Sequence, residues 1–144
     1  MLNMVILIGL PASGKSTFYN RMFSKTHLRI NLDMLKTRTR EKALIDTCLL
    51  TKTPFVVDNT NVKVADRKGY ILLAKEHGFL VHGYYIASSV ERCLAMNDLR
   101  QEKVPRVAIL AKKKHFEYPS INEGFDSLFY VHHDFSIEPW KNTE

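Results

Sequence analysis

An apolar run, Met4-Val5-Ile6-Leu7-Ile8, leads directly into the glycine-bounded segment Gly9–Thr17, and this junction restricts the fold more than any other part of the chain. A short apolar run that ends at a glycine predicts a parallel strand covered by helices on both faces. The following nine residues match G-x-x-x-x-G-K-[ST] and precede a stretch of helical length, the context in which this pattern forms a phosphate-binding loop, or P-loop. A plain turn would not need a lysine and a hydroxyl residue directly after its second glycine.

Each part of this loop suits a phosphate ligand. Glycines let the backbone approach phosphate oxygens, and N–H groups of the turn and of the next helix supply partial positive charge. Lys15 adds a full charge, and the Ser16 hydroxyl is suited to ligate magnesium. We therefore expect ATP and Mg²⁺ as cofactors. The predicted cofactor contacts come from Gly9, Ala12, Ser13, Gly14, Lys15, Ser16 and Thr17.

Strand-like and helix-like segments alternate along the rest of the chain. Such alternation predicts an α/β fold, a three-layer α/β/α sandwich around a mostly parallel sheet of five strands. We find no internal repeat and no linker, so we expect one domain over residues 1–144. The predicted strands are 4–8, 27–31, 54–58, 79–86 and 125–132, and the predicted helices are 15–24, 35–50, 64–77, 89–101 and 104–116.

Composition indicates a globular protein, because 45% of the residues are hydrophobic and 25% are charged. The longest apolar stretches fall far short of the roughly 20 residues needed to cross a bilayer. The N-terminus carries no charged leader, so we expect a cytoplasmic protein with no membrane association. Cys48 and Cys93 lie in apolar helical patterns and are expected to be buried thiols. The net charge of +6 favours a polyanionic partner such as nucleic acid.

A carboxylate, Asp33, follows the second predicted strand. Strand ends of an open parallel sheet converge on the ligand crevice, so Asp33 is a candidate general base for an attacking hydroxyl group. It can equally cap the next helix by accepting a backbone N–H, and the residues alone leave both interpretations open. The cations Lys36, Arg38 and Arg40 suit an acceptor phosphate, or else form an exposed basic helix face.

The third predicted strand ends at Asp58, and the polar residues Asn59-Thr60-Asn61 follow it. This is a Walker B-type position, from which a carboxylate can hold a magnesium-bound water or orient the acceptor. The alternative is a turn that caps the next helix. The pattern favours the first interpretation, with Ser16 and Asp58 as metal ligands.

A short charged connection, Arg100–Arg106, joins two predicted helices, and its Pro105 suits the first turn of the second helix. These helices would form a short lid. Arg100 can neutralise charge on a transferring phosphoryl group, although arginines between helices are also ordinary surface residues.

Taken together, these motifs resemble the polynucleotide 5′-hydroxyl kinases, including the kinase domains of the phage and animal end-healing enzymes. The resemblance covers most of the chain and implies the P-loop kinase fold. It implies ATP-dependent transfer of the γ-phosphate to the 5′-OH end of DNA or RNA. The matching segments, in family order, are Gly9–Thr17, Asn31–Asp33, Val56–Asn61, Asp66-Arg67, Cys93–Pro105 and Phe116–Asp126.

The resemblance also implies roles for single residues. Asp33 would be the general base, Lys15 and Arg100 a cationic clamp on the phosphates, and Ser16 the magnesium ligand. Asp58 would be an acid near both the metal and the acceptor, and Glu123–Asp126 would lie near the base of the nucleotide. The implied substrate contacts are Asp58, Asn61, Arg67, Lys36, Arg38 and Arg40, with Thr17 and Arg67 ranked second.

Three positions depart from the family pattern. Leu32 stands where the family often has arginine, Lys36 where phage-type enzymes have arginine, and Met96 where they have a second lid arginine. Two alternatives stay open: a P-loop kinase of a small-molecule or nucleotide acceptor, in which the basic charge only steers phosphates, and a nucleotide-binding regulatory module without turnover, which Leu32 and Met96 motivate. The sequence assigns no protein partner.

Overall fold

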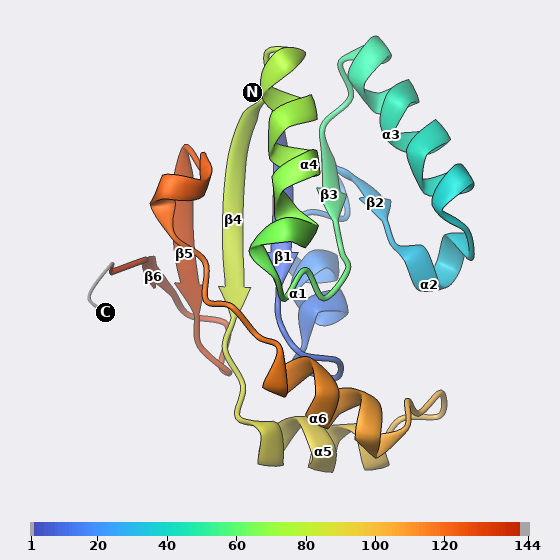
Figure 1. Cartoon of the computed structure of the whole chain (residues 1–144), viewed down its shortest axis with the longest axis vertical. Coiled ribbons are helices and arrows are strands. Elements are labelled where there is room, and N and C mark those ends of the chain that lie inside the picture. The colour runs from blue at the N-terminus through green and yellow to red at the C-terminus, as the bar shows by residue number, and fades with distance from the viewer. Residues whose placement is uncertain (1, 142–144) are drawn as a thin grey trace.

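A single sheet of six strands forms the centre of the computed structural model, which describes residues 2–141 (Figure 1). The spatial order of the strands is β2-β3-β1-β4-β5-β6. The strands are β1 (Asn3–Ile8), β2 (Leu28–Ile30), β3 (Phe55–Val57), β4 (Leu80–Ile86), β5 (Ser127–Val131) and β6 (Ile137–Pro139), and the helices are α1 (Lys15–Met22), α2 (Leu32–Leu35), α3 (Arg38–Thr51), α4 (Val64–Glu76), α5 (Val90–Asp98), α6 (Arg106–Lys114) and the 3₁₀ helix η1 (Ile121–Glu123).

The first five strands pair in parallel, which confirms the expected α/β fold with a mostly parallel sheet. The number of strands differs from the prediction, because β6 adds a sixth, antiparallel strand beside β5. Its Ile137-Glu138-Pro139 segment is too short to show an alternating pattern. The turn before it closes through a hydrogen bond from the His132 N–H to the Ser136 carbonyl oxygen.

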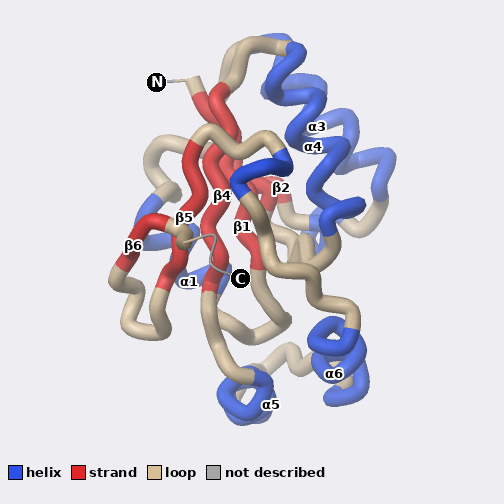
Figure 2. Tube along the Cα trace, turned by 60° about the vertical axis from the view of Figure 1, so that its left-hand side comes forward, coloured by secondary structure: helices blue, strands red, loops and turns tan. Residues whose placement is uncertain are grey.

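β1 lies between helices on both faces of the sheet (Figure 2), and its alternate residues belong to two separate apolar layers. Met4, Ile6 and Ile8 pack in one layer with α3 and α4, whereas Val5 and Leu7 pack in the other with α1. The helices contribute Ile45, Cys48 and Leu49 from α3, Ile71 and Ala74 from α4, and Phe18 and Tyr19 from α1, with Phe23 directly after α1.

The helix predicted over residues 35–50 is in fact two helices. Lys36 ends α2 with a positive φ of 77°, a conformation that interrupts the helix. Thr37 is extended and begins α3, where its hydroxyl accepts a hydrogen bond from the Arg40 N–H. The break separates α2, which carries Asp33, from the long helix that packs on the sheet.

The lid helices α5 and α6 pack against each other beyond the carboxyl ends of the parallel strands (Figure 2). A small apolar cluster of Cys93, Ile109 and Leu10 connects them to the phosphate loop. Both cysteines are buried free thiols, as expected. None of the helices between residues 2 and 141 has the length and apolar character needed to cross a membrane.

Candidate active site

The phosphate loop runs from the end of β1 to the start of α1, in a conformation that depends on its glycines. Gly14 precedes α1 with φ 106°, a left-handed conformation that side chains rarely tolerate. A Cβ atom on Gly9 would lie 2.7 Å from Ser13 Oγ and 3.1 Å from the Ile86 carbonyl oxygen. The sequence pattern at these two positions therefore reflects close approach as well as backbone freedom.

Lys15 folds back over its own loop. Its Nζ donates to the carbonyl oxygens of Gly9 at 3.1 Å and Leu10 at 2.8 Å. Burial lowers the pKa of Lys15 to about 8, and the nearby carboxylate of Asp58 partly opposes that shift. The charged Lys15 would be stabilised more strongly by a phosphate group than by the two neutral carbonyl groups that now accept its hydrogen bonds.

The loop has further hydrogen-bond donors that could bind an anion. The first hydrogen bond into α1 runs from the Phe18 N–H to the Gly14 carbonyl at 2.9 Å, so the preceding helical N–H groups lie at an open helix end. Ser13 Oγ is buried and has no hydrogen-bond partner among the described residues. An orphaned hydroxyl beside free helical N–H groups fits a phosphate ligand in this loop.

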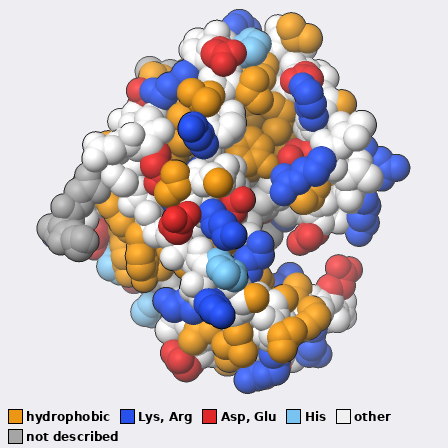
Figure 3. Space-filling model, viewed as in Figure 1, with side chains coloured by type: hydrophobic (Ala, Val, Ile, Leu, Met, Phe, Trp, Pro, Cys, Tyr) orange, Lys and Arg blue, Asp and Glu red, His pale blue; other side chains and the backbone are white. Residues whose placement is uncertain are grey.

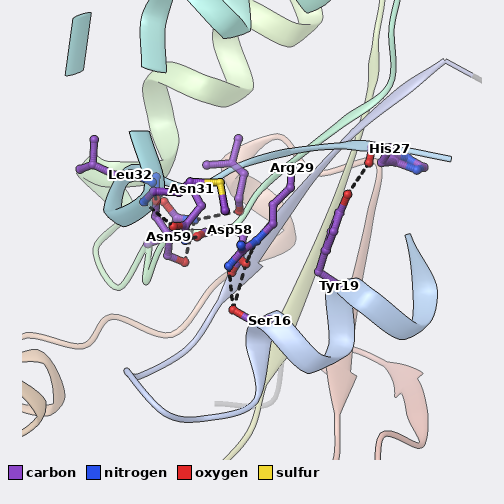
Figure 4. Close-up of polar contacts among 11 residues, drawn as sticks. Ser16, Tyr19, His27, Arg29, Asn31, Leu32, Asp58 and Asn59 are labelled. Atoms are coloured by element: carbon purple, nitrogen blue, oxygen red, sulfur yellow. Dashed lines mark hydrogen bonds and ion pairs between the residues drawn. The ribbon is translucent and has the colours of Figure 1, made fainter. Parts of the chain in front are cut away.

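Ser16 and Asp58 meet across the end of the sheet (Figure 4). The Ser16 hydroxyl donates to Asp58 Oδ2 at 3.4 Å, and Asp58 is only 1% exposed. Arg29 reaches both groups from β2: its Nε donates to Asp58 Oδ2 at 2.7 Å and its Nη2 donates to Ser16 Oγ at 2.8 Å. The two residues that the sequence assigned to a metal are therefore neighbours, joined by a third residue that it did not assign.

This pair fits a magnesium ion only if other ligands complete the coordination shell. Within residues 2–141, no cluster of three or more His, Cys, Asp and Glu side chains could hold a metal ion. Hydroxyl and carboxylate oxygens are ligands that Mg²⁺ prefers, and Mg²⁺ commonly takes its remaining ligands from substrate phosphates and water. Ser16 and Asp58 would hold such an ion beside the phosphate loop.

Asp33 is exposed on α2 and does not cap that helix. The N-cap is Asn31, whose side-chain oxygen accepts from the Met34 N–H at 2.9 Å. In the described part of the chain, the Asp33 carboxylate has neither a hydrogen bond nor an ion pair. Of the two interpretations that the residues left open, capping is therefore wrong, and the carboxylate faces solvent with its acceptor oxygens available.

The segment that carries Asp33 is fastened to the end of β3. Asn31 Nδ2 donates to the Asp58 carbonyl oxygen at 2.7 Å, and the Leu32 N–H donates to Asn59 Oδ1 at 2.9 Å (Figure 4). Asn59 Nδ2 in turn donates to Glu41 Oε2 at 2.9 Å. These bonds hold the two strand ends together, so Asp33 and Asp58 open onto one cavity.

The lid closes the other side of that cavity. Asn97 ties the lid helices together, because its Nδ2 donates to the Val104 carbonyl at 2.8 Å and its Oδ1 accepts from the Val104 N–H at 3.0 Å. Arg100 lies between α5 and α6 and lines the cavity together with Met96. Figure 3 shows the hollow between the lid and the body of the molecule, with lysine and arginine side chains on both sides of it.

One cavity of about 510 Å³ therefore collects the phosphate loop, the ends of β2 and β3, and the lid. It brings together most of the predicted site. The predicted residues that line it are Ala12, Gly14, Lys15, Ser16, Thr17, Asp33, Arg38, Asp58 and Arg100.

Two predicted substrate contacts have structural partners instead. The Arg67 side chain is fully buried, where its Nε donates to Glu123 Oε1 at 2.8 Å and its Nη1 donates to the Asn61 carbonyl at 2.8 Å. Asn61 is also buried, and its Nδ2 donates to the Leu7 carbonyl at 2.8 Å. Neither side chain lines the cavity, because each satisfies polar groups inside the fold.

The other predicted cations also differ in whether they line the cavity. Arg38 lines the cavity but also donates to Glu41 Oε1 at 2.9 Å. Arg40 donates to the Leu35 carbonyl at 3.2 Å, and neither Arg40 nor Lys36 lines the cavity. Glu123 to Asp126, expected near the nucleotide base, precede β5 and so lie toward the amino end of the parallel strands, opposite the phosphate loop.

Sequence reasoning missed two cations of the site, Arg29 and Lys112. Lys112 lines the cavity from α6, although it belongs to a run of three lysines, Lys112–Lys114, a pattern that more often marks a solvated helix face. Its spacing of four residues from Ala108 puts both on one face of α6, but only the tertiary structure shows that this face lines the cavity. For Arg29 no local signal exists either, because its role depends on which strand lies beside β2.

A larger cavity of about 840 Å³ lies elsewhere and shares no lining residue with the first. Aromatic rings of Tyr118, Tyr130 and Trp140 form much of its wall, together with His132 and Glu138, which form an ion pair if the histidine is protonated. The phosphate loop contributes nothing to it, so the smaller cavity is the candidate active site.

Comparison with known proteins agrees with this geometry. The chain is 33% identical over 131 residues to a bifunctional polynucleotide phosphatase/kinase of Schizosaccharomyces pombe, covering 86% of this chain and 32% of the relative. It is 30% identical to a protein of the same designation from Acanthamoeba polyphaga mimivirus, covering 97% of this chain and 37% of the relative. The expected resemblance is thus confirmed, although the chain spans only about a third of the length of these relatives.

Other similarities are broader. An L-seryl-tRNA(Sec) kinase of Methanococcus maripaludis is 28% identical over 85% of this chain and 56% of its own length. Among solved structures, Chaetomium thermophilum Kti12 in complex with ADP-AlF₃ superposes with a TM-score of 0.73 at 17% identity, covering 98% of this chain and 91% of that one. At that identity the likeness supports the fold alone.

A family model described as an AAA domain matches residues 36–119, which is more than half of the chain. The matched region contains α3, Asp58 and the whole lid, and the phosphate loop precedes it. The chain therefore belongs to the family of P-loop proteins that this AAA-domain model describes, and its fold is that of the P-loop kinases.

Proposed function

We propose that this protein transfers the γ-phosphate of ATP to the 5′-hydroxyl end of DNA or RNA. The observation that carries the proposal is the 510 Å³ cavity, in which the phosphate loop, Asp58, Asp33 and Arg100 share one space. Two relatives, at 33% and 30% identity, are named as polynucleotide phosphatase/kinases, and their names support a nucleic-acid acceptor over other alcohols.

The chain supplies positioning and charge for this reaction, since phosphoryl transfer asks little covalent chemistry of the protein. The phosphate loop binds the β- and γ-phosphates of ATP, with Lys15 released from its loop carbonyls to neutralise their charge. Mg²⁺, when bound at Ser16 and Asp58, supplies further charge neutralisation on the phosphates. Arg100 approaches the transferring group from the lid.

Asp33 serves as the general base on the acceptor side. Its unpaired carboxylate accepts the proton of the 5′-hydroxyl group while the hydroxyl oxygen forms a bond to the γ-phosphorus. The bond from the γ-phosphorus to the oxygen that bridges it to the β-phosphate breaks, and ADP leaves with that electron pair. The products are ADP and a 5′-phosphorylated end, and the proton resides on Asp33 until solvent removes it.

The acceptor side of the cavity suits a polyanion. Arg38 and Lys112 line it from opposite walls, on α3 and α6, and both can contact a phosphodiester next to the terminal hydroxyl. Leu32, which stands where the family often has arginine, also lines the cavity and supplies an apolar surface for a sugar or base instead. The net charge of +6 adds long-range attraction for nucleic acid.

The test is transfer of label from γ-labelled ATP, with Mg²⁺, to a 5′-OH oligonucleotide and to its 5′-phosphorylated twin. We expect the first to be labelled and the second not, for DNA, RNA or both. Absence of label on every 5′-OH strand, with ATP binding intact, would reject a polynucleotide acceptor.

A second candidate is a kinase of another alcohol. The observation in its favour is the similarity to a protein named as an L-seryl-tRNA(Sec) kinase, together with Leu32 and Met96 in place of the family's arginines. Parallel reactions with seryl-tRNA and a panel of small hydroxyl compounds separate the two candidates. Label on one of these acceptors but on no 5′-OH end would favour the second, and nucleotide binding without transfer to anything would favour a regulatory module.

A further inference from the structure

Arg29 is a cation built into the candidate active site that the motif pattern does not assign. It lies on β2, and its guanidinium bridges Ser16 and Asp58, the two side chains suited to Mg²⁺ (Figure 4). The Nε donates at 2.7 Å to Asp58 Oδ2, and the Nη2 donates at 2.8 Å to Ser16 Oγ. A guanidinium stays charged at every pH at which proteins work, so this positive charge is permanent.

The two partners of this ion pair differ in their access to solvent. The Asp58 side chain is 1% exposed, whereas the Arg29 side chain is 25% exposed. The guanidinium also lies over the ring of Tyr19, at 5.9 Å from its centroid, and Tyr19 is held in place because its hydroxyl donates to the His27 carbonyl at 2.6 Å (Figure 4). The partly exposed Arg29 side chain can therefore move into solvent, whereas the buried Asp58 carboxylate still needs a cationic partner after Arg29 has moved.

A divalent ion and the guanidinium compete for the same oxygen atoms. Ser16 Oγ donates its one proton to Asp58 and accepts a hydrogen bond from Arg29, so an ion bound to this hydroxyl would lie directly beside Arg29. Mg²⁺ binds oxygen at about 2.0–2.1 Å, well inside hydrogen-bond distance. Two cations at such a separation repel each other, and the repulsion is stronger where burial lowers the effective dielectric constant.

We propose that Arg29 is a positioning residue that neutralises Asp58 while no divalent cation is bound, and that its guanidinium leaves both Ser16 Oγ and Asp58 Oδ2 when a divalent cation is held there with the nucleotide. This inference rests on the proposed function to the extent that it takes the site to bind a metal–nucleotide complex. Arg29 thereby weakens metal binding and ties it to a movement of the Arg29 side chain.

Metal affinity tests the competition directly. The probe is Mn²⁺ in the presence of saturating ADP, with free Mn²⁺ measured by electron paramagnetic resonance. Arg29→Met keeps an unbranched stem and removes the charge, and we expect it to bind Mn²⁺ at least about fivefold more tightly than the unaltered protein. Arg21→Met is the matched control, because it removes one charge from the far end of α1, where Arg21 lies over the Phe135 ring and touches neither Ser16 nor Asp58.

Equal or weaker Mn²⁺ binding by Arg29→Met, with the Arg21→Met control unchanged, would overturn the proposal. Thermal melting first establishes that both variants are folded. A second measurement needs no variant: in ¹⁵N-arginine-labelled protein saturated with ADP, added Mg²⁺ should shift the Arg29 Nε–H resonance and remove its protection from exchange. A resonance that keeps its shift and its protection would overturn the proposal even if Arg29→Met failed to fold.

Neither measurement uses an acceptor. Failure of the protein to phosphorylate 5′-OH ends would thus leave the metal result standing, and a failed metal result would leave the choice of acceptor untouched. The inference and the proposed function can be rejected separately.

Discussion

Arg67 and Glu123 form an ion pair inside the fold, with the Arg67 side chain fully buried and the Glu123 side chain 9% exposed. Two bonds join them, from Arg67 Nε to Glu123 Oε1 at 2.8 Å and from Arg67 Nη2 to Glu123 Oε2 at 3.0 Å. The pair fastens α4 to η1, next to the start of β5. A residue expected to contact substrate is thus part of the structural frame.

Arg67→Met should destabilise the protein strongly, by about 3–5 kcal/mol, because it leaves the Glu123 carboxylate buried without its partner. Urea denaturation measures the loss. The double variant Arg67→Met/Glu123→Gln should recover part of it, since the unpaired charge is then gone. Lys42→Met, which breaks an exposed pair with Asp46, is the control and should cost less than about 1 kcal/mol. If Arg67→Met kept its stability but lost phosphoryl transfer, Arg67 would instead be assigned to the substrate site.

Asp33→Asn should lower turnover by roughly 10²–10⁴-fold while the affinity for ATP changes little, because the carboxylate acts on the acceptor proton and is not among the groups assigned to the nucleotide phosphates. Single-turnover kinetics and equilibrium ATP binding measure the two effects. Asp46→Asn, an acidic residue on the exposed side of α3, serves as the control for the change in charge. A fully active Asp33→Asn protein would remove Asp33 from the reaction.

Arg100→Gln should reduce turnover by roughly 10²–10³-fold, because an arginine in the lid stabilises charge that develops on the transferring phosphoryl group. Arg106→Gln is the matched lid control, since Arg106 lies outside the cavity and, among residues 2–141, pairs only with Asp98, at 3.5 Å on the exposed surface. Comparing kcat for the two variants at saturating substrate separates a catalytic arginine from general lid stability. Equal losses in both would argue against a direct role for Arg100.

Nucleotide affinity should fall as the pH rises through about 8, the value to which burial lowers the pKa of Lys15. Below that pH the free protein already carries the charged lysine, and above it binding must first restore the proton, which costs up to about tenfold in affinity per pH unit. Lys15→Arg, which stays charged, should bind with a much flatter dependence. Titrations of ADP at several pH values measure both, and identical slopes would assign the effect to another group.

Much of the fold follows from local pattern. The apolar run before Gly9 is buried in both core layers, as a strand between helices must be, and the parallel pairing of five strands agrees with the alternation of elements. The break at Lys36 and the sixth strand were not predictable in the same way. A helical pattern continues across residues 35–50 without any Gly or Pro, and Ile137–Pro139 gains its pairing only because β5 lies beside it.

The candidate site likewise contains some residues that local sequence predicts and others that only the tertiary structure brings together. The phosphate loop is one continuous segment whose geometry is set by glycines and a following helix, so Lys15 and Ser16 could be assigned before any tertiary structure was known. The capping choice at Asp33 depended on Asn31 two residues earlier, which competes for the same helix end. The division into one domain stays a prediction.

Contacts between strand ends depend on the order of the strands, which local pattern does not contain. Arg29 and Asp58 are 29 residues apart and meet only because β2 pairs with β3 in a register that aligns Ile30 with Val57. The same pairing brings Asp33 to the phosphate loop, while Arg67, one helix further on, turns into the interior. The phosphate loop could be predicted from sequence because its residues are consecutive. The partner of each buried charge depends instead on strand order and packing, because a buried charge must be compensated by groups that the tertiary structure places next to it.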